Sequence, residues 1–527
     1  MTAMLKSLKK LLSTIKRKSP APFILSPNNG AIPVSDKLEP NKQQIRHLLG
    51  SAQDITMRDF QIDTENKRQL NALLVAVEGL VDESAIRQNV LRALMEKPLD
   101  DKANVLTQVE QRLYVKKFML EADLNKAILE MLHGAALLFI EGLAQAIVIP
   151  AEAYELRTIS EPPTEAVVKG PREGFVEATS TNLALLRRRI PHPALRFETI
   201  VIGQYTRSEI TIAYVEGIAD PQVVENVKTR LREIRTDSLL SSGELEQYIE
   251  EAPYSIFPTV GNTERPDKAA SMMMEGRVVI LVSGDPVALT VPHLFIECLQ
   301  NQEDYSSRPY LASFIRLLRV SAFVASVTLP SVYLFAMNFH KESIPSELIV
   351  SMTEARQRVP FPIEMELLGL MVAFEIVREA GVRMPRAIGQ TVSIVGALIL
   401  GQVSVQAGFI GAPTIIVVAM SAIASFIITP IAEVAALLRF LMVIPTALFG
   451  FFGFIGVGLM ILTHMASLNS FGAAYLAPIS PFYFREWKDT FVRFPYRSLR
   501  KRPRSIPHVR SVRIEQMPDG RKGQRDD

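Results

Sequence analysis

The sequence is poor in the residues and motifs that mark disulfide-bonded domains and enzymes. It has one cysteine, Cys298, in 527 residues, so no internal disulfide can form, which fits a soluble region facing a reducing cytoplasm. It has no Walker A loop, no dinucleotide-binding glycine pattern, no Gly-x-Ser-x-Gly elbow and no Cys-x-x-Cys pair. We therefore expect neither an enzyme nor a cofactor-binding protein.

Metal and nucleic-acid sites have little support in the sequence. The seven histidines are scattered, and His192 and His293 have no spaced third ligand, so we expect structural roles for them. The basic run LRRRIPHP, Leu186–Pro193, has no interleaved aromatic residues, which favours a solvated or salt-bridged face over nucleic-acid binding. Its candidate acidic partners in the sequence are Asp237, Glu250, Glu251, Glu264 and Asp267.

Long apolar runs are absent before about Tyr310 and dominate beyond it. The length of these runs predicts membrane spans. A first span is predicted at Leu317–Met337, where charged LASFIRLLR gives way to an apolar run. Three more spans are predicted at Ile388–Ile410, Pro413–Ile431 and Leu438–Met465.

Both ends of the chain are basic. The first residues, MTAMLKSLKKLLSTIKRK, lack the apolar core of an export signal; their leucines fit weak docking on lipid, with a solvated tail as the alternative. The C-terminal tail contains RSLRKRPR, Arg497–Arg504. The positive-inside rule predicts that both ends stay in the cytoplasm, which requires an even number of spans and agrees with four.

A short pattern ending in Glu-Gly occurs three times before the spans. It occupies Leu73–Asp82, Leu137–Gln145 and Ile212–Asp220, and each copy has the pattern of a strand that ends in a turn. The first and third copies are followed at once by helical sequence, which predicts a β-α unit used twice. A further strand pair is predicted at Val278–Pro292.

The predicted fold class is an α/β cytoplasmic region of two subdomains followed by an all-α polytopic membrane domain. A chain of 527 residues is long enough for several separate cores. The predicted parts are a basic arm and linker at 1–40, subdomains at 41–165 and 166–305, a membrane domain at 306–482 and a basic tail at 483–527.

The segment Glu364–Gly381 lies between predicted spans and yet is charged. A helix there has a polar stripe of Glu364, Met371, Glu375, Arg378 and Glu379 and an apolar stripe of Leu367, Leu370, Phe374 and Val377. Because carboxylates inside a membrane normally face protein, water or a transported ion, we interpret the segment as re-entrant or pore-facing. Two alternatives are an interfacial helix and a structural lock between Glu375 and Arg378 or Arg383.

Small and polar residues also occur inside the later spans. Gln402 and Gln406 share one helical face, which suits either tight helix packing or a water-lined path. In the last span we expect Gly450, Gly453, Gly456 and Gly458 to serve packing.

Six stretches together resemble one family, the A subunits of spore germination receptors, or GerA family. They are GPREGFVEATSTNLALLRRRI (170–190), SIFPTVGNTERPD (255–267), EGRVVILVSGDP (275–286), RPYLASFIRLLR (308–319), FHKESIPSELI (339–349) and VPFPIEMELLGLMVAFEIVREAGVRMPRAIGQ (359–390).

The resemblance implies a multi-pass protein of the spore inner membrane, with its N-terminal region and tail in the cytoplasm. It implies a transporter-like B subunit and a C-subunit lipoprotein as partners, contact with membrane lipids, and a homo-oligomeric channel for monovalent cations that a nutrient opens. Candidate pore or gating residues are Glu364, Glu366, Met371, Glu375, Glu379, Gln402 and Gln406. Structural residues of the family-like motifs are Arg316, Arg319, Pro360, Phe361, Pro362, Arg378, Gly381, Arg383 and Pro385.

Two other functions are consistent with the same resemblance. One is an accessory channel of the family that amplifies ion release. The other is a non-conducting scaffold or signalling subunit that docks partners through its α/β region.

Overall fold

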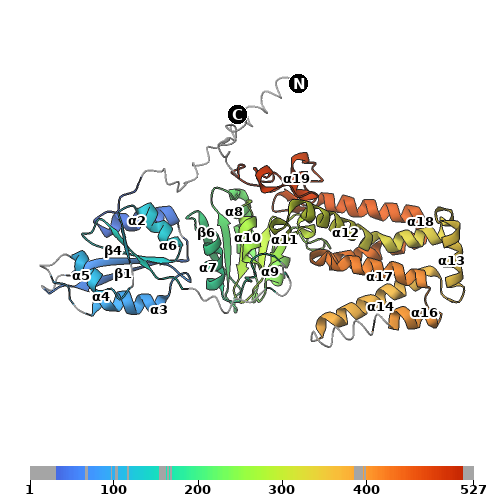
Figure 1. The fold of residues 1–527 in the computed structure, drawn as a ribbon, viewed down its shortest axis with the longest axis horizontal. Coiled ribbons are helices and arrows are strands. Elements are labelled where there is room, and N and C mark those ends of the chain that lie inside the picture. Colours follow the sequence, from blue (N-terminus) through green and yellow to red (C-terminus); the bar gives the residue numbers. More distant parts are fainter. Residues whose placement is uncertain are drawn as a thin grey trace, which may run out of the picture.

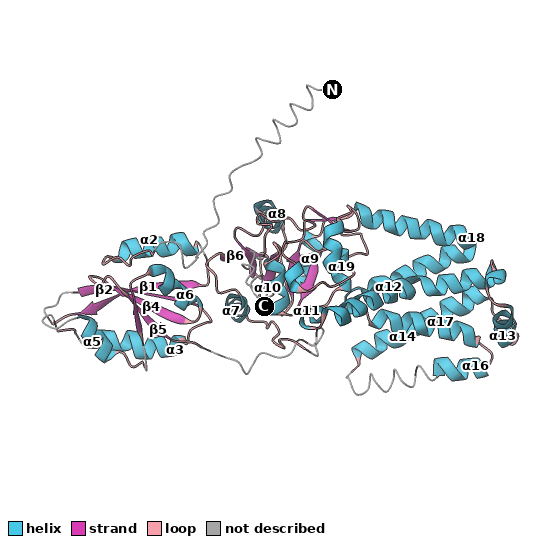
Figure 2. Ribbon diagram, turned by 45° about the horizontal axis from the view of Figure 1, so that its top comes forward, coloured by secondary structure: helices cyan, strands magenta, loops and turns pink. Residues whose placement is uncertain are grey.

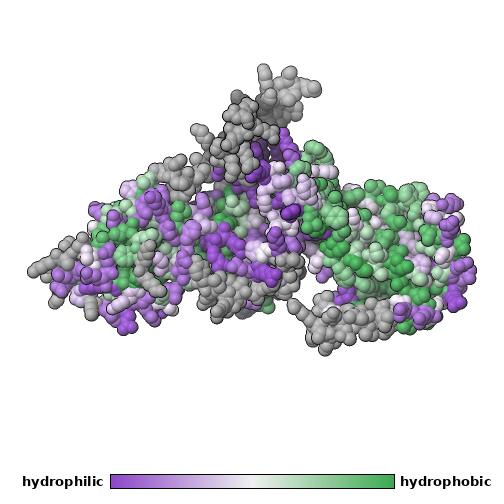
Figure 3. All heavy atoms as spheres, viewed as in Figure 1, coloured by the Kyte–Doolittle hydropathy of each residue, from purple (hydrophilic) through white to green (hydrophobic). Residues whose placement is uncertain are grey.

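The computed structural model describes residues 31–513, apart from 51, 66–68, 97, 101–104, 116–117, 154–161, 163–164, 166–168, 385–395 and 397–398. Figure 1 shows three parts in a row along the longest axis: a first sheet with its helices, a second sheet with its helices, and a helical part. Figure 3 shows that the hydrophobic surface gathers over the helical part.

Among the described residues, the first sheet has five strands in the order β1-β2-β4-β5-β3, and every neighbouring pair is antiparallel. The strands are β1 (Ile55–Asp63), β2 (Gln69–Val77), β3 (Met119–Glu121), β4 (Ala135–Ile140) and β5 (Ala146–Pro150). The helices are α2 (Leu38–Leu49), α3 (Glu83–Ile86), the π-helix η1 (Arg87–Arg92), α4 (Ala93–Met95), α5 (Val105–Arg112) and α6 (Leu124–Leu132).

The second sheet repeats the topology of the first. Its strand order among the described residues is β6-β7-β9-β10-β8, again antiparallel throughout. The strands are β6 (Leu195–Ile202), β7 (Ser208–Val215), β8 (Gly261–Thr263), β9 (Val278–Val282) and β10 (Ala288–Val291). The helices are α7 (Thr179–Arg189), α8 (Pro221–Glu233), α9 (Ser242–Ile249) and α10 (Pro266–Met273).

The three Glu-Gly pairs lie at the turns that end β2, β4 and β7. Gly79, Gly142 and Gly217 have φ of 78°, 92° and 79°, a region that favours glycine because it has no Cβ. Two of these turns lead into a helix, where the carboxylates of Asp82 and Asp220 accept hydrogen bonds from backbone N–H groups of the first turn. The predicted β-α unit used twice is thus confirmed.

Helices cover both faces of each sheet (Figure 2). In the first sheet, alternate residues of β2 enter two different cores: Leu73 and Val75 pack with α2 and α6, and Leu74 and Ala76 pack with α3 to α5. This explains why six consecutive residues of β2 are buried. The predicted strand pair at Val278–Pro292 is β9 and β10, which form an antiparallel pair within the second sheet.

The helical part follows the short α11 (Glu303–Ser306). Its helices are α12 (Pro309–Asn338), α13 (Ser346–Arg356), α14 (Ile363–Arg383), the π-helix η4 (Ile399–Val403), α16 (Ser404–Gln406), α17 (Ala412–Phe426) and α18 (Ala432–Ser467). The chain then returns to the second sheet through the short strands β11 (Asn469–Ser470) and β12 (Ala473–Ala474) and the helix α19 (Trp487–Thr490). Among the described residues, two helical stretches are long and apolar enough to cross a membrane, Pro309–Asn338 and Thr429–Ser467.

The element α18 is a hairpin of two helices. Gly450 has φ 58° and ψ −130°, backbone angles that are not helical and interrupt the helix at this residue. A Cβ on Gly453 would overlap the carbonyl oxygen of Pro445, although eight residues of straight helix span about 12 Å. Both ends of α18, Ala435 and Met465, belong to one core cluster. Each half is therefore about 26 Å long and runs beside the other.

This hairpin corrects the predicted span Leu438–Met465, which is two antiparallel helices because the glycines make a turn there. The predicted span Leu317–Met337 lies inside α12. Most of Pro413–Ile431 forms α17, a helix of 15 residues, which is shorter than a full span. The predicted span Ile388–Ile410 lies largely outside the described residues, and the total number of spans stays a prediction.

We predict that Gly450→Ala and Gly453→Ala each destabilise the protein by about 1 to 3 kcal/mol, since the first forces a side chain into a left-handed conformation against Phe339 and the second creates a clash with backbone. Thermal unfolding of the detergent-purified full chain measures this. Gly456→Ala and Gly458→Ala are the controls, because a Cβ there meets open space. Equal behaviour of both pairs would contradict the hairpin.

Candidate functional site

The helix α14 lies against α12, α17 and α18 along one face. Leu367, Leu370 and Met371 are buried in a cluster with Tyr333 of α12 and Val418 of α17. Met371, predicted on the polar stripe, thus belongs to the core. The exposed face of α14 contains Met365, Gly369, Val372 and Ile376.

The carboxylate of Glu366 is buried and fully engaged. Its Oε1 accepts a hydrogen bond of 2.7 Å from the backbone N–H of Gly411, just before α17. Its Oε2 lies 3.2 Å from a guanidinium nitrogen of Arg356 in α13. Because a buried carboxylate is costly unless it is paired, these contacts make Glu366 a fixed joint between three helices.

Glu364 and Glu379 lie near opposite ends of α14, the first half-buried and the second exposed. Glu364, at the first turn, accepts a hydrogen bond from the side-chain amide of Asn338 at the end of α12. Glu379 is exposed and pairs with exposed Arg383 at 2.6 Å. Such an exposed pair within one helix contributes little stability.

Glu375 lies between two arginines. Its Oε2 is 2.7 Å from Nε of Arg378, one turn along α14, and its Oε1 is 3.7 Å from Nη1 of Arg439 in α18. Arg439 is almost completely buried. Its Nε donates to the carbonyl of Ser326 at 2.8 Å and its Nη2 to the carbonyl of Ser421 at 3.3 Å.

Arg439 therefore connects four helices, α12, α14, α17 and α18, at one point. Sequence reasoning missed it, although an arginine inside the apolar run LLRFLMVIP was a signal. Its Nη1 has no hydrogen-bond partner among the described residues, so Glu375 is the group that compensates its charge on that side. Of the two partners predicted for Glu375, the structure gives Arg378, while Arg383 pairs with Glu379.

The remaining predicted residues are dispersed. Gln402 and Gln406 are exposed. Pro360, Phe361 and Pro362 are exposed just before α14, and Gly381 is half-buried near its end. Pro385 lies outside the described residues.

A second charged cluster joins the second sheet to α12. Asp304 of α11 is buried and contacts Nε of Arg316 at 2.9 Å and Nη1 of Arg319 at 2.8 Å. Arg316 also pairs with Asp489 of α19 at 2.9 Å. Burial alone would raise the pKa of Asp304, but hydrogen bonds and charge from Arg319 and Arg316 outweigh burial and lower it. We call these residues, with Tyr305, the junction cluster.

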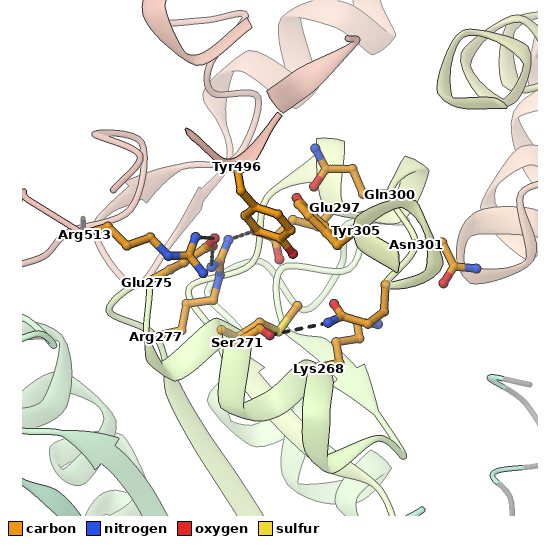
Figure 4. A pocket seen from close by; sticks show the side chains of 12 residues that line it. Lys268, Ser271, Glu275, Arg277, Glu297, Gln300, Asn301, Tyr305, Tyr496 and Arg513 are labelled. Atoms are coloured by element: carbon orange, nitrogen blue, oxygen red, sulfur yellow. Dashed lines mark hydrogen bonds and ion pairs between the residues drawn. The ribbon is translucent and has the colours of Figure 1, made fainter. Parts of the chain in front are cut away.

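A small polar pocket of about 70 Å³ adjoins the junction cluster. Figure 4 shows Glu275 between Arg277 and Arg513, with Tyr496 above them. Arg277 pairs with Glu275 at 2.5 Å and with Glu297 at 2.7 Å. This volume is enough for a few water molecules.

A larger cleft of about 670 Å³ lies between the two sheet regions. One wall is the turn Glu78–Ser84, which follows β2, with His133 and Glu152 beside it. The other wall is α7, with Ser180 and Arg188. The volume is in the range of small-molecule sites.

The basic run of α7 has salt-bridge partners, as predicted, but not the predicted ones. Arg187 is buried and holds Asp54 through Nε and Nη2, both at 2.9 Å. Arg188 and Arg189 share Glu173. His192 accepts from the N–H of Ala194, and His293 contacts Glu297 and Cys298.

We predict that Asp304→Asn lowers the free energy of unfolding by about 3 kcal/mol or more, because two arginines lose the carboxylate that compensates them. The pKa of Asp304 is lowered in the folded state. Its contribution to stability is therefore complete above its unfolded pKa of about 4 and is lost as the pH falls through its folded pKa. Thermal unfolding of the full chain at several pH values measures both effects.

Glu303→Gln in the same short helix is the matched control for Asp304→Asn. We expect it to leave stability nearly unchanged, because among the described residues Glu303 forms hydrogen bonds only through its backbone. A fall in stability no larger than that of the control would contradict the importance of the junction cluster.

Comparison with known proteins agrees with the resemblance. The profile of the family described as Bacillus/Clostridium GerA spore germination protein matches residues 43–505. The chain is 39% identical to spore germination protein KA of Bacillus subtilis (strain 168), over 91% of this chain and 88% of that protein. It is 33% identical to spore germination protein GerLA of Bacillus cereus, over 88% and 94%.

Part of the chain is also similar to a solved structure. It is the crystal structure of the N-terminal domain of the A subunit of the Bacillus megaterium spore germinant receptor GerK3, with 32% identity and a TM-score of 0.41, covering 51% of this chain and 99% of that one. The match over residues 43–505, together with relatives at 39% and 33% identity, shows that this chain belongs to the GerA family of spore germination proteins.

Proposed function

We propose that the chain is the A subunit of a nutrient germinant receptor in the spore inner membrane, acting with a B subunit and a C-subunit lipoprotein. Several copies form a cation channel, and its opening starts germination. The observation that carries this proposal is the set of ionisable side chains inside an apolar helical part, with Arg439 and Glu375 at its centre. Such groups mark ion paths or gates in membrane proteins.

The helix contacts support a multi-pass arrangement with the sheets on one side. α12 leads away from the sheets and ends where Phe339 packs on Gly450. α14 starts beside that end, at Asn338, and returns toward Phe426 at the end of α17. α17 also returns, and the α18 hairpin goes out and back.

One further outward pass between α14 and α17 would complete six passes along the helical part, the short α17 included, in place of the predicted four spans. The predicted span Ile388–Ile410 lies at that point of the sequence. This arrangement puts Arg378 and Arg383 on the side of the sheets, which the positive-inside rule favours for a cytoplasmic face. It keeps both basic ends of the chain on that face.

In this proposal the exposed face of α14 and the exposed Gln402 and Gln406 line a path between copies. Glu364 and Glu379, near opposite ends of α14, attract cations at its two mouths. The ion pair of Glu375 and Arg439 holds α14 against the other helices. It takes part in gating and does not select the ion.

We predict that Glu364→Gln with Glu379→Gln lowers cation flux about threefold or more, because the local concentration of cations at the mouths falls. Flux through vesicles that contain the receptor with both partners measures it. Glu347→Gln, an exposed acid of α13, is the control. No flux with all partners present would favour the scaffold, and slowed ion release in spores without this chain would favour the accessory channel.

We predict that Glu375→Gln destabilises the protein by about 1 to 3 kcal/mol, because Arg439 stays buried and charged. Adding Arg439→Met should restore most of the lost stability. This rescue is expected if Glu375 compensates the charge of Arg439, and it is not expected if Glu375 acts as a pore acid. Thermal unfolding of the two single variants and the double variant measures the coupling. Glu379→Gln with Arg383→Gln is the exposed control pair, and strict additivity at Glu375 and Arg439 would refute this compensation.

A further inference from the structure

The segment that follows the α18 hairpin exposes aromatic side chains next to the helical part. Phe482 and Phe484 are 62% and 76% exposed. The ring of Phe482 lies 5.3 Å from that of Trp487, which lies 5.1 Å from that of Phe491. A cluster of rings that is packed on one side and open on the other has a face without a partner.

Basic side chains surround these rings. Arg485, Lys488, Arg497, Lys501 and Arg504 are exposed, and in the described part of the chain no carboxylate forms an ion pair with them. The nearby acids are engaged elsewhere: Glu486 accepts from the N–H of Arg504 and from Ser505, and Asp489 holds Arg316. The outward charge of the segment is therefore positive.

The segment lies level with the start of α12. The backbone N–H of Arg493 donates to Oγ of Ser313 at 3.0 Å, and on the same first turns of α12 Tyr310 and Phe314 are 92% and 63% exposed. Figure 3 shows that the hydrophilic surface of the middle part gives way to the hydrophobic surface of the helical part. Aromatic and basic residues at such a boundary match the chemistry of a bilayer surface.

We propose that residues 482–504 form a binding surface for anionic lipid headgroups on the membrane face where the sheets lie. The rings enter the headgroup layer and the five basic side chains meet lipid phosphates. This inference rests on the proposed membrane function. Bound lipid would also fix the position of α19. Because Asp489 of α19 contacts Arg316 and Tyr305, it would thereby stabilise the junction cluster.

Trp487 offers a direct test, because it is the one tryptophan in the sequence. The full chain in detergent is titrated with short-chain phosphatidylglycerol or phosphatidylcholine while the fluorescence of Trp487 is followed. We expect saturable binding of phosphatidylglycerol. In lipid nanodiscs, a quencher near the headgroup should reduce the fluorescence more than one at the end of the acyl chain.

The triple variant Arg485→Gln, Lys488→Gln and Arg497→Gln should bind phosphatidylglycerol roughly tenfold more weakly or worse. The matched control is Arg58→Gln, Arg87→Gln and Lys126→Gln, three exposed positions around the first sheet, which should change nothing. The inference would be overturned by equal responses to both lipids or by a triple variant that binds phosphatidylglycerol normally. Absence of quenching from either depth would also overturn it, because protein would then cover the rings.

Retention of the full chain in vesicles after an alkaline wash separates this inference from the proposed function. A chain that is retained while Trp487 does not respond to anionic lipid refutes only the lipid surface. A chain that washes off refutes the membrane function on which both depend.

Discussion

Buried arginines, each at a place where two parts of the chain meet, are the constraint on which this structure depends. Arg187, Arg265, Arg316 and Arg439 are among the largest side chains with almost no exposed surface in the described part of the chain. A guanidinium stays charged and presents five donors in one plane, so burial requires acceptors at fixed positions. Each of these arginines thereby defines the geometry of a junction, which matters more than any net stability it adds.

The four junctions follow the chain from one end to the other. Arg187 joins the two sheet regions through Asp54. Arg265 holds the segment that connects them. It donates to the carbonyls of Glu165 at 3.1 Å and Pro171 at 2.9 Å, and it pairs with Asp267 at 2.9 Å. Arg316 ties the second sheet region to α12 and α19, and Arg439 ties the helices to one another.

The sequence predicted local features well and distant pairings poorly. The Glu-Gly turns and the strands before them could be recognised because glycine at positive φ and a short apolar run are local signals. The antiparallel strand order could not, since β2 pairs with β4 across several helices. Asp54 was not foreseen for Arg187 because it lies 133 residues away. The hairpin in α18 was missed because the apolar run continues through Gly450 without a polar turn.

The hairpin makes the chain enter and leave the helical part at the same end, where α12 begins and the segment after Ser467 returns. Both segments are held there by Asp304, Arg316 and Asp489, so the near end of α12 is fixed and its far end is the part that a tilt would displace most. Its 30 residues are about 45 Å long. A tilt of only about 5° at the fixed end would displace the far end of α12 by about 4 Å, so small changes around Asp304 and Asp489 are magnified along the helix.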